Sequence, residues 1–442
     1  MLKKITYPHS PYNQKLNIDG LNEHYDPLCI LDSNSQSNKN QRLYSDKIIA
    51  VGATAELLVD SNNNNALEQL QEFCYKKKNS WLFGYLSYDL KNEIEQLSSD
   101  NIDNTGFPFL HFFIPEVILQ IENNRLTVFY DDGCVTKEKA ETIYHLAFDQ
   151  SSPSNEVEAA SSFISQYKPT ILSRITKQEY INSVNQLKQH IGKGDIYEVN
   201  FCQEFFAENA IINTVDIFKK LNIISQAPFS AFYTTNNHYL ICASPERFIR
   251  KHSNNLISQP IKGTAKRSVV PYEDQKFKLE LRNSEKEKSE NVMIVDLVRN
   301  DLSKLAKRGT VNVDELFGIY SFKQVHQMIS TISCELKDTI TFTDIIKSTF
   351  PMGSMTGAPK VNAMKLIEKY ENTKRGLYSG TVGYINPDGD FDFNVVIRSI
   401  LYNQANKYLS FMVGGAITNK SDAENEYEEC LLKAKAMFEV LK

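Results

Sequence analysis

Two pairs of glutamates offer the clearest chemistry in this chain. Glu287 and Glu290 fall on one face of a predicted helix, and Glu426 and Glu429 fall on one face of another. One such pair is most often a solvated helix face, because like charges repel at this spacing. Two pairs on separate helices could instead converge on a hard cation. Mg2+ suits that role, since it is held by one or two carboxylates while waters and substrate oxygens complete its octahedron.

A lysine at the end of a predicted hairpin is a candidate nucleophile. Lys262 follows Pro260, which marks a strand end, and precedes Gly263, which permits a sharp bend or a close approach to a ligand. Lys266 and Arg267 would lower its proton affinity if they lay close, and a neutral lysine is a nucleophile. A solvated basic turn is the simpler interpretation of this stretch taken alone.

Three further polar residues occupy unusual positions. Glu246 follows a proline at a predicted strand end and could act as a general acid with a raised pKa. Arg398 lies in an apolar run, residues 395–401, that predicts a strand, so its charge must be paired or must face a site. His326 lies in another predicted strand, where a lone histidine is more often structural than functional.

The junction before the last helix could bind an anionic ligand. Gly414, Gly415 and Ala416 are predicted to lie between a strand and that helix, where they would expose backbone N–H groups. Lys433 falls on the helix face that carries the second glutamate pair, so it could attract a substrate carboxylate. It could equally form an ordinary ion pair with Glu429.

The elements that would position these residues are hairpins interleaved with long helices. A capping box formed by Ser421 and Glu424 predicts the start of the last helix. A charged helical stretch covers residues 274–305, and residues 109–121 form one predicted strand of a hairpin. This pattern favours an α+β fold, with antiparallel sheets covered by helices, over a parallel doubly wound sheet.

Length and composition limit the class of protein. The 442 residues exceed the usual size of one hydrophobic core, so we expect one large composite domain or two domains, at residues 1–150 and 170–442, joined by a polar connector at 149–170. The net charge of -5 argues against nucleic acid as the main partner. Seven scattered cysteines without a Cys-x-x-Cys pair fit a reducing cytoplasm. The N-terminus lacks the apolar core of a signal peptide, and no apolar run reaches membrane-spanning length.

A set of motifs runs in order through residues 170–442. The motifs are Gly194-Asp195-Ile196-Tyr197, Ala243-Ser244-Pro245-Glu246, Pro260-Ile261-Lys262-Gly263-Thr264, Met293-Ile294-Val295-Asp296-Leu297 with Arg299-Asn300-Asp301, Thr356-Gly357-Ala358-Pro359-Lys360, Tyr378-Ser379-Gly380 and Gly414-Gly415-Ala416-Ile417. In these motifs the chain resembles the chorismate-utilising enzymes. The first 150 residues look like the N-terminal region of the large components of anthranilate and aminodeoxychorismate synthases. The resemblance implies an α+β fold, with two antiparallel β-sheets packed as a sandwich and flanking helices.

Lysine at position 262 points to one branch of this family. Aminodeoxychorismate synthases usually have lysine there, whereas anthranilate synthases usually have alanine. The resemblance implies that Lys262 attacks C2 of chorismate, that Glu246 assists the departure of the 4-hydroxyl, and that ammonia then adds at C4 to give 4-amino-4-deoxychorismate.

The resemblance also implies a metal site and a substrate site. Glu290 and Glu429 match the direct Mg2+ ligands, and Glu287 and Glu426 match residues that support the ion through water. The residues that would hold the substrate's carboxylates are Tyr378, Arg398, Gly415 and Lys433, and those that would line its ring are Thr264 and His326.

Two other regions bear on the branch and on regulation. Glu198 stands where many amine-using members have glutamine and where isochorismate and salicylate synthases have the lysine that activates water, which counts against the water-using branch. Ser33, together with Pro228, Phe229 and Ser230, resembles the segments that bind tryptophan in both amine-using branches. These four residues are therefore a candidate tryptophan pocket.

The resemblance implies partners as well as a substrate. Because no glutamine amidotransferase segment is attached, we expect a separate subunit of that kind to supply ammonia. A separate aminodeoxychorismate lyase would complete 4-aminobenzoate for folate synthesis. The alternatives are an anthranilate synthase large component, which Lys262 argues against, an isochorismate synthase, which Glu198 opposes, and a non-catalytic chorismate-binding protein, which would bind without turnover.

Overall fold

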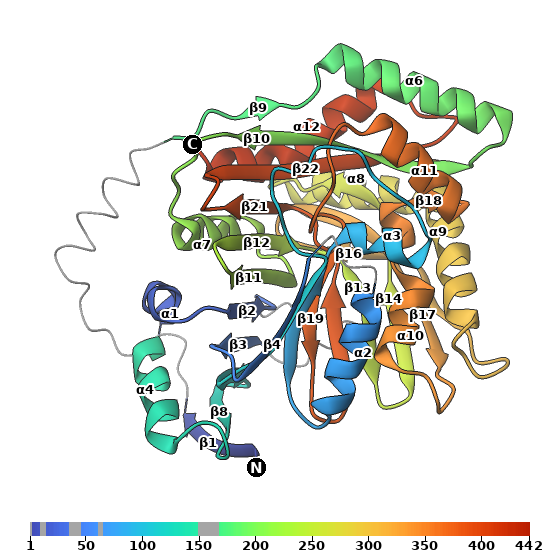
Figure 1. Cartoon of the computed structure of the whole chain (residues 1–442). Helices are drawn as coiled ribbons and strands as arrows, with labels where there is room; N and C mark the ends of the chain where they lie inside the picture. Colours follow the sequence, from blue (N-terminus) through green and yellow to red (C-terminus); the bar gives the residue numbers. More distant parts are fainter. Residues whose placement is uncertain (1, 9–14, 35–45, 61–64, 149–167) are drawn as a thin grey trace.

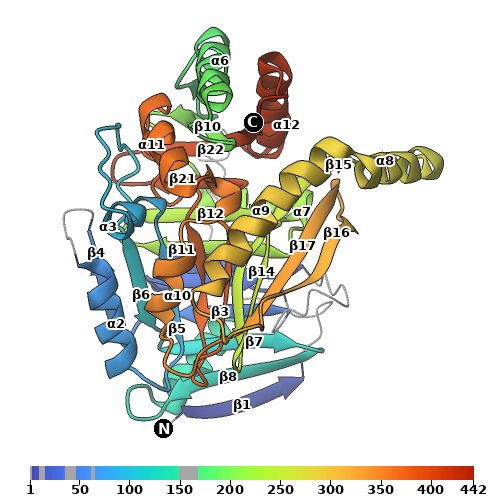
Figure 2. The same cartoon turned by 90° about the vertical axis from the view of Figure 1, so that its right-hand side faces the viewer.

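The computed structural model describes residues 2–8, 15–34, 46–60, 65–148 and 168–442. Within them the chain forms two large antiparallel sheets with helices around the outside (Figure 1). In Figure 2 strands of the larger sheet run across the view, whereas several strands of the smaller sheet run up it. The α+β sandwich predicted from the sequence is confirmed. Most of the predicted connector, residues 149–167, lies outside the described residues.

Every pairing within the two sheets is antiparallel. The larger sheet has the order β1 (Leu2–Pro8), β8 (Arg125–Asp131), β7 (Val117–Glu122), β3 (Lys47–Val51), β2 (Leu28–Asp32), β11 (Phe229–Thr235), β12 (His238–Ser244), β21 (Ser399–Asn403), β22 (Tyr408–Ile417), β10 (Glu198–Ala207) and β18 (Gly357–Ala358), with β9 (Leu172–Ser173) beside β10. The smaller sheet has the order β15 (Ile261–Lys266), β17 (Val325–Glu335), β14 (Asn255–Gln259), β13 (Arg247–His252), β20 (Phe391–Asn394), β19 (Thr381–Ile385), β5 (Leu82–Leu86), β6 (Leu110–Ile114) and β4 (Ala55–Val59), with β16 (Asn312–Ser321) beside β17.

Helices cover the outer faces of both sheets. Those that share a core with the larger sheet are α1 (Ile18–His24), α4 (Lys137–Phe148), α6 (Lys177–Lys193), α7 (Thr214–Ser225), α11 (Lys360–Tyr370) and α12 (Ala423–Val440). Those that share a core with the smaller sheet are α2 (Ala66–Lys76), α9 (Glu285–Ser303) and α10 (Phe342–Thr349), and the described residues also form α3 (Lys91–Ile94) and α8 (Pro271–Asn283).

The larger sheet is buried on both faces. In β3, Ile48 and Ala50 point into the core between the sheets, whereas Ile49 and Val51 point into the core beneath the helices. Successive side chains of a strand alternate between faces, so each face of this strand needs apolar residues. This is why its sequence is a continuous apolar run rather than an alternating one.

The chain passes from one sheet to the other at several points, and these crossings position the polar residues. Residues 109–121, predicted as one strand, are divided between β6 of the smaller sheet and β7 of the larger sheet. Glu246 lies on the crossing from β12 to β13. Arg398 lies on the crossing from β20 to β21 rather than in the predicted strand, and its φ of 53° places it in the left-handed region.

Two predicted helix boundaries are wrong. The stretch 274–305 is two helices, α8 and α9, because Ser284 adopts an extended backbone and caps α9 by accepting a hydrogen bond from the Glu287 N–H. The residue that caps α12 is Asp422, whose side chain accepts from the Asn425 N–H, whereas the Ser421 hydroxyl accepts from the Thr418 N–H.

The glycines predicted to follow a strand lie inside one, since β22 continues to Ile417.

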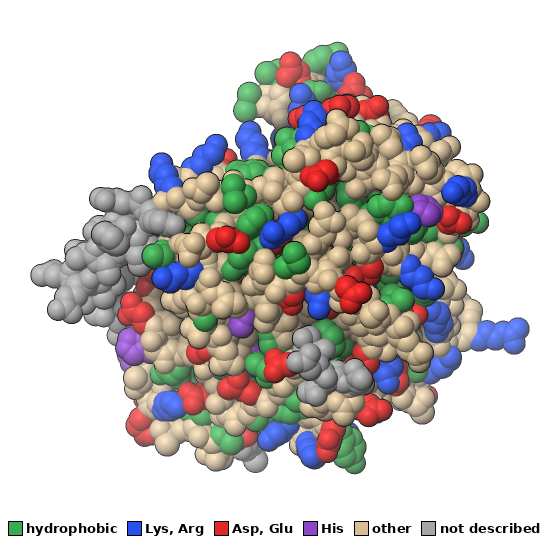
Figure 3. All heavy atoms as spheres, turned by 45° about the horizontal axis from the view of Figure 1, so that its top comes forward, with side chains coloured by type: hydrophobic (Ala, Val, Ile, Leu, Met, Phe, Trp, Pro, Cys, Tyr) green, Lys and Arg blue, Asp and Glu red, His purple; other side chains and the backbone are tan. Residues whose placement is uncertain are grey.

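Strands from residues 1–150 lie in both sheets beside strands from residues 170–442. On the face shown in Figure 3, acidic and basic side chains are interspersed among the described residues. Among the described helices, none has the length and apolar character needed to span a bilayer.

Candidate active site

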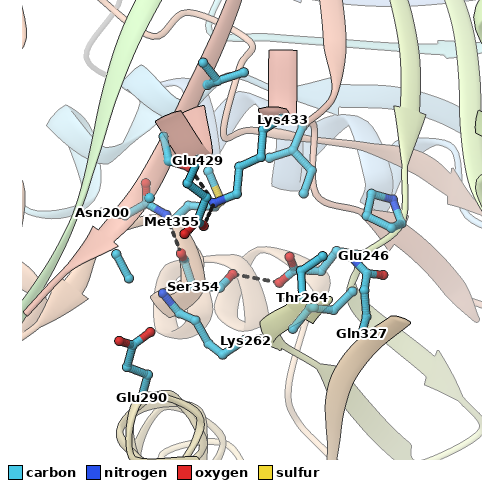
Figure 4. A pocket seen from close by; sticks show the side chains of 18 of the residues that line it. Asn200, Glu246, Lys262, Thr264, Glu290, Gln327, Ser354, Met355, Glu429 and Lys433 are labelled. Carbon is cyan, nitrogen blue, oxygen red and sulfur yellow. Dashed lines mark hydrogen bonds and ion pairs between the residues drawn. The ribbon is translucent and has the colours of Figure 1, made fainter. Parts of the chain in front are cut away.

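A cavity opens where β15, β22, α9, α12 and the two crossings at Glu246 and Arg398 meet. Its open volume, which includes solvent at its mouth, is about 940 Å3. It brings together all the catalytic, substrate and metal residues predicted from the sequence except His326 (Figure 4). They are Glu246, Lys262, Thr264, Glu287, Glu290, Tyr378, Arg398, Gly415, Glu426, Glu429 and Lys433.

Lys262 reaches into this cavity from β15. The register of β15 against β17 shifts between Ile261 and Thr264, and Gly263 has a φ of 94° at that point. A Cβ on Gly263 would lie 3.0 Å from a carboxylate oxygen of Glu287, so glycine also leaves room for this metal-site candidate.

The surroundings of Lys262 hold its ammonium in an ion pair and do not favour loss of its proton. Its Nζ lies 2.6 Å from Oε1 of Glu198, which is fully buried. Burial alone would lower the pKa of Lys262, but Glu198 and, more weakly, Glu290 and Glu246 raise it above its usual value. The expected lowering by neighbouring cations is therefore wrong. Arg267 is engaged with Asp274 at 2.8 Å, so its charge is already partnered.

Glu246 has the properties expected of an acid. The residue is 4% exposed, and burial raises the pKa of its carboxyl to about 7. The Ser354 hydroxyl donates a hydrogen bond to its Oε1 at 2.7 Å, and Asn200 in turn donates to the Ser354 carbonyl at 2.8 Å. Arg247, the first residue of β13, forms a bidentate ion pair with Asp392, with both N–O distances at 2.9 Å. The raised pKa predicted for Glu246 is confirmed, and Ser354 is a contact that the sequence did not reveal.

The two glutamate pairs meet from α9 and α12. Burial raises the pKa of Glu290 to about 7 and raises the pKa values of Glu287 and Glu426 as well. The pKa of Glu429 is lowered, because Lys433 lies 2.8 Å from it. The Lys286 ammonium lies between the pairs, 3.9 Å from Glu290 and 3.7 Å from Glu426. The four carboxylates therefore carry more negative charge than Lys286 and Lys433 offset.

These carboxylates fit a hard cation. Oε1 of Glu290 is buried and accepts no hydrogen bond from any residue that the structure describes. Across the described ranges, no three acidic, histidine or cysteine side chains form a closed metal cluster. An open set of carboxylate oxygens is what Mg2+ uses when waters and substrate complete its coordination. The donor atoms present therefore match the predicted ion.

Two cations and a glycine face the carboxylates. The Arg398 guanidinium forms no hydrogen bond or ion pair with any described residue, although it lines the cavity. Burial lowers the pKa of Arg398, but the ordinary pKa of a guanidinium is so high that the group stays charged. Lys433 both lines the cavity and pairs with Glu429, and it donates to the Gly414 carbonyl at 2.9 Å. A Cβ on Gly415 would lie 3.1 Å from a Glu426 oxygen, so its backbone approaches the carboxylates closely.

His326 does not line the cavity, but its neighbour does. Its two ring nitrogens contact Asp274 at 3.0 Å and Ser321 at 2.8 Å. Adjacent residues of a strand point to opposite faces, so Gln327 of β17 faces the cavity instead (Figure 4). The Gln327 Oε1 is buried, and no donor in the described part of the chain reaches it. The alternation of the strand was visible in the sequence, but which face met the cavity was not.

A second cavity gathers the residues of the candidate tryptophan pocket. Its open volume is about 440 Å3, and it lies between β2, β11, β19 and β20. Its lining mixes apolar and polar groups, which suits a ligand with an aromatic ring and polar ends. The lining residues are Leu31, Asp32, Ser33, Ile48, Pro228, Phe229, Ser230, Val382, Gly383, Tyr384, Asp392 and Asn394.

Comparison with known proteins gives a consistent family. The family model described as chorismate binding enzyme matches residues 27–439. The chain is 35% identical to a probable aminodeoxychorismate synthase, chloroplastic, of Oryza sativa subsp. japonica, over 81% of this chain and 43% of the relative, so it spans less than half of that protein. It is 33% identical to aminodeoxychorismate synthase component 1 of Escherichia coli, over 81% of this chain and 76% of the relative.

The fold is also found in a solved structure. Anthranilate synthase component I from Streptococcus pneumoniae superposes with a TM-score of 0.75 at 24% identity, over 91% of this chain and 95% of the other. At this identity the likeness concerns the fold alone. It agrees with the two antiparallel sheets and flanking helices described above.

Proposed function

The chain belongs to the family of chorismate-binding enzymes, and on that premise we propose that it aminates chorismate at C4 to give 4-amino-4-deoxychorismate. The observation that carries this proposal is the placement of Lys262 in the cavity beside the buried acid Glu246. A lysine in that position supplies a nucleophile that an anthranilate synthase, with alanine there, would lack.

The proposed reaction uses these two residues in sequence. Nζ of Lys262 attacks C2 of chorismate, the ring double bonds shift, and the C4–O bond breaks. Glu246 gives its proton to the departing hydroxyl, which leaves as water. Its pKa of about 7 supports this role, because an appreciable fraction is protonated near neutral pH. Ammonia then adds at C4 as Lys262 departs from C2.

The four glutamates are the proposed metal residues. Glu290 and Glu429 would hold Mg2+ directly, with Glu287 and Glu426 acting through water. When bound, the ion would neutralise the charge of the ring carboxylate. Lys286 lies between Glu290 and Glu426, and we propose that it balances part of their charge while no cation is present.

Orientation of the substrate is assigned to groups that face the metal residues. The free guanidinium of Arg398 suits a bidentate contact with a carboxylate. Tyr378, the backbone of Gly415 and Lys433 would complete the carboxylate contacts. Thr264 would line the ring, and Gln327 replaces His326 in that proposed role because its amide faces the cavity.

The proposed partners follow from the reaction. A separate glutamine amidotransferase subunit would deliver ammonia, and the name component 1 of the Escherichia coli relative supports a second component. A separate lyase would release 4-aminobenzoate for folate synthesis.

All seven cysteines are free thiols, which supports a reducing compartment such as the cytoplasm. The second cavity is proposed to take tryptophan, which titration calorimetry with that amino acid would test.

A product assay tests the main proposal. The purified protein is incubated with chorismate, Mg2+ and ammonium, with and without aminodeoxychorismate lyase. Formation of 4-aminobenzoate only when the lyase is present supports amination at C4. Anthranilate formed without the lyase would instead assign amination to C2. Bound chorismate without any product would favour the binding-protein alternative. Glutamine-dependent product on addition of an amidotransferase subunit tests the partner.

A further inference from the structure

We infer that Glu198 is the base that takes the proton from Nζ of Lys262 and so generates the nucleophile. This inference rests on the proposed function of Lys262. Glu198 does not line the cavity, so it has no direct access to the substrate. Its contact with the reaction is through the lysine nitrogen, which lies 2.6 Å from Oε1.

Glu198 is held rigidly at the start of β10. Its backbone pairs with Ala358 of β18, and the preceding residue, Tyr197, donates to the Ala358 carbonyl at 2.7 Å. Gly357 has a φ of 144°, and a Cβ there would lie 2.1 Å from the Glu198 carbonyl oxygen. The two strands can approach this closely only because residue 357 is a glycine. Since β10 and β15 belong to different sheets, the pair with Lys262 also joins the two sheets.

The second oxygen of Glu198 is the unusual feature. Oε2 is buried and has no hydrogen-bond partner within the described part of the chain. A buried carboxylate normally satisfies both oxygens, because an unpaired buried charge is costly. Among the described residues, Lys262 is therefore the one donor that stabilises the charge of Glu198. The carboxylate is thus ready to accept the proton when the ammonium must give it up.

Other charged groups around Lys262 are less suited to this role. Carboxylates face it from the β12–β13 crossing (Glu246), from α9 (Glu287 and Glu290) and from α12 (Glu429). Glu246 must hold a proton in the same step in order to release the hydroxyl. The glutamates of α9 and α12 are assigned to the cation. Lys286 and Lys433 face the same carboxylates from the two helices and carry positive charge.

The proton balance closes with Glu198 as the acceptor. One Nζ–H bond of Lys262 breaks and an O–H bond forms on Glu198. The freed electron pair makes the N–C2 bond while the C4–O bond breaks and Glu246 protonates the leaving oxygen. When ammonia adds at C4, the N–C2 bond breaks with its electron pair returning to Nζ. Glu198 then gives the proton back to Nζ, and the ammonium formed at C4 gives one proton to Glu246, so all three residues regain their starting states.

The test is Glu198→Gln, which keeps the shape and a hydrogen-bond acceptor but cannot take a proton. With saturating ammonium, chorismate and Mg2+, we expect kcat near pH 7 to fall by at least about 100-fold, the low end for a general base. In the variant, Lys262 must lose its proton to solvent. The ratio of variant to wild-type kcat should therefore rise about tenfold per pH unit until the lysine is half deprotonated. Taking the ratio cancels the ionisation of Glu246, which affects both proteins.

Two further variants separate this role from a structural one. Glu204→Gln makes the same change at a buried glutamate of the same strand, where Arg174, Tyr408 and Ser410 hold the carboxylate away from the cavity. The ratio of its kcat to the wild-type kcat should not change with pH. Glu198→Asp retains a base at a longer distance, so it should recover activity relative to the glutamine variant and lose the steep pH dependence.

The outcomes distinguish this inference from the proposed function. If the wild-type protein forms no 4-amino product, the proposed function fails and this inference fails with it. If the wild-type protein does form that product, a Glu198→Gln variant with unchanged kcat, or with a pH-independent ratio, overturns this inference alone. If Glu198→Gln does not fold, as judged by thermal unfolding, the pH profile of Glu198→Asp decides. A ratio that rises tenfold per pH unit there would also overturn the inference.

Discussion

Replacing Glu246 by glutamine should stabilise the protein at alkaline pH while removing its acid. The ordinary pKa of this carboxyl is 4.5, and burial raises it to about 7 in the folded protein. The folded state therefore holds the proton more tightly than the unfolded state does. Below the unfolded pKa both states are protonated and the carboxyl costs nothing. As the pH rises from 4.5 to about 7, the unfolded state gains more from ionisation, so the wild-type protein loses stability.

The size of this loss follows from the two pKa values. One pKa unit corresponds to about 1.4 kcal/mol, so the full loss above pH 7 is about 3 kcal/mol. Glutamine has no charge to bury and can still accept the hydrogen bond from the Ser354 hydroxyl. Any packing change is the same at every pH. The free energy of unfolding of Glu246→Gln, relative to wild-type, should therefore rise by about 2–3 kcal/mol between pH 5 and pH 8.5.

Urea unfolding followed by tryptophan fluorescence measures this difference, with EDTA present to remove bound cations. Trp81 is the sole tryptophan and packs against Phe129 of the larger sheet and Tyr384 of the smaller one, so its emission reports separation of the sandwich. Glu204→Gln is the matched control, because it makes the same substitution at another buried glutamate. There the change leaves Arg174 without its carboxylate, so it should lower stability rather than raise it. A difference between Glu246→Gln and wild-type that does not change with pH would refute the reasoning.

Further predictions concern activity and packing. Wild-type kcat should fall as the pH rises through about 7, because Glu246 loses the proton that it must donate, and a rate profile checks this. Lys262→Ala should lose most amination at C4, measured by product separation, and an unchanged rate would contradict the covalent mechanism. Glu429→Gln should abolish Mg2+-dependent turnover in a titration of activity against Mg2+, whereas Glu424→Gln, exposed on the same helix, should not. Arg398→Met should raise KM for chorismate by about 10- to 100-fold, the equivalent of one lost charge-assisted contact.

The sequence alone determined the chemistry of the site to a large extent. Spacing on a helix placed Glu287 with Glu290, because residues three apart share a helix face whatever the tertiary fold. A proline before Glu246 and a glycine after Lys262 marked interruptions of regular strand structure, since these residues restrict or free the local backbone. The same local rules predicted hairpins, helices and therefore the α+β class. Such features depend on residues close in the sequence, which is why they could be predicted.

Only the tertiary structure decided what each of these groups contacts. It placed Glu198, 64 residues away in the sequence, against Lys262, and so reversed the expected direction of the lysine's pKa shift. It divided residues 109–121 between two sheets, and it placed Arg398 and Glu246 at crossings between the sheets. It turned Gln327 rather than His326 toward the cavity. Burial, charge and the facing side of a strand are set by the register and packing of distant segments, and no local pattern specifies them.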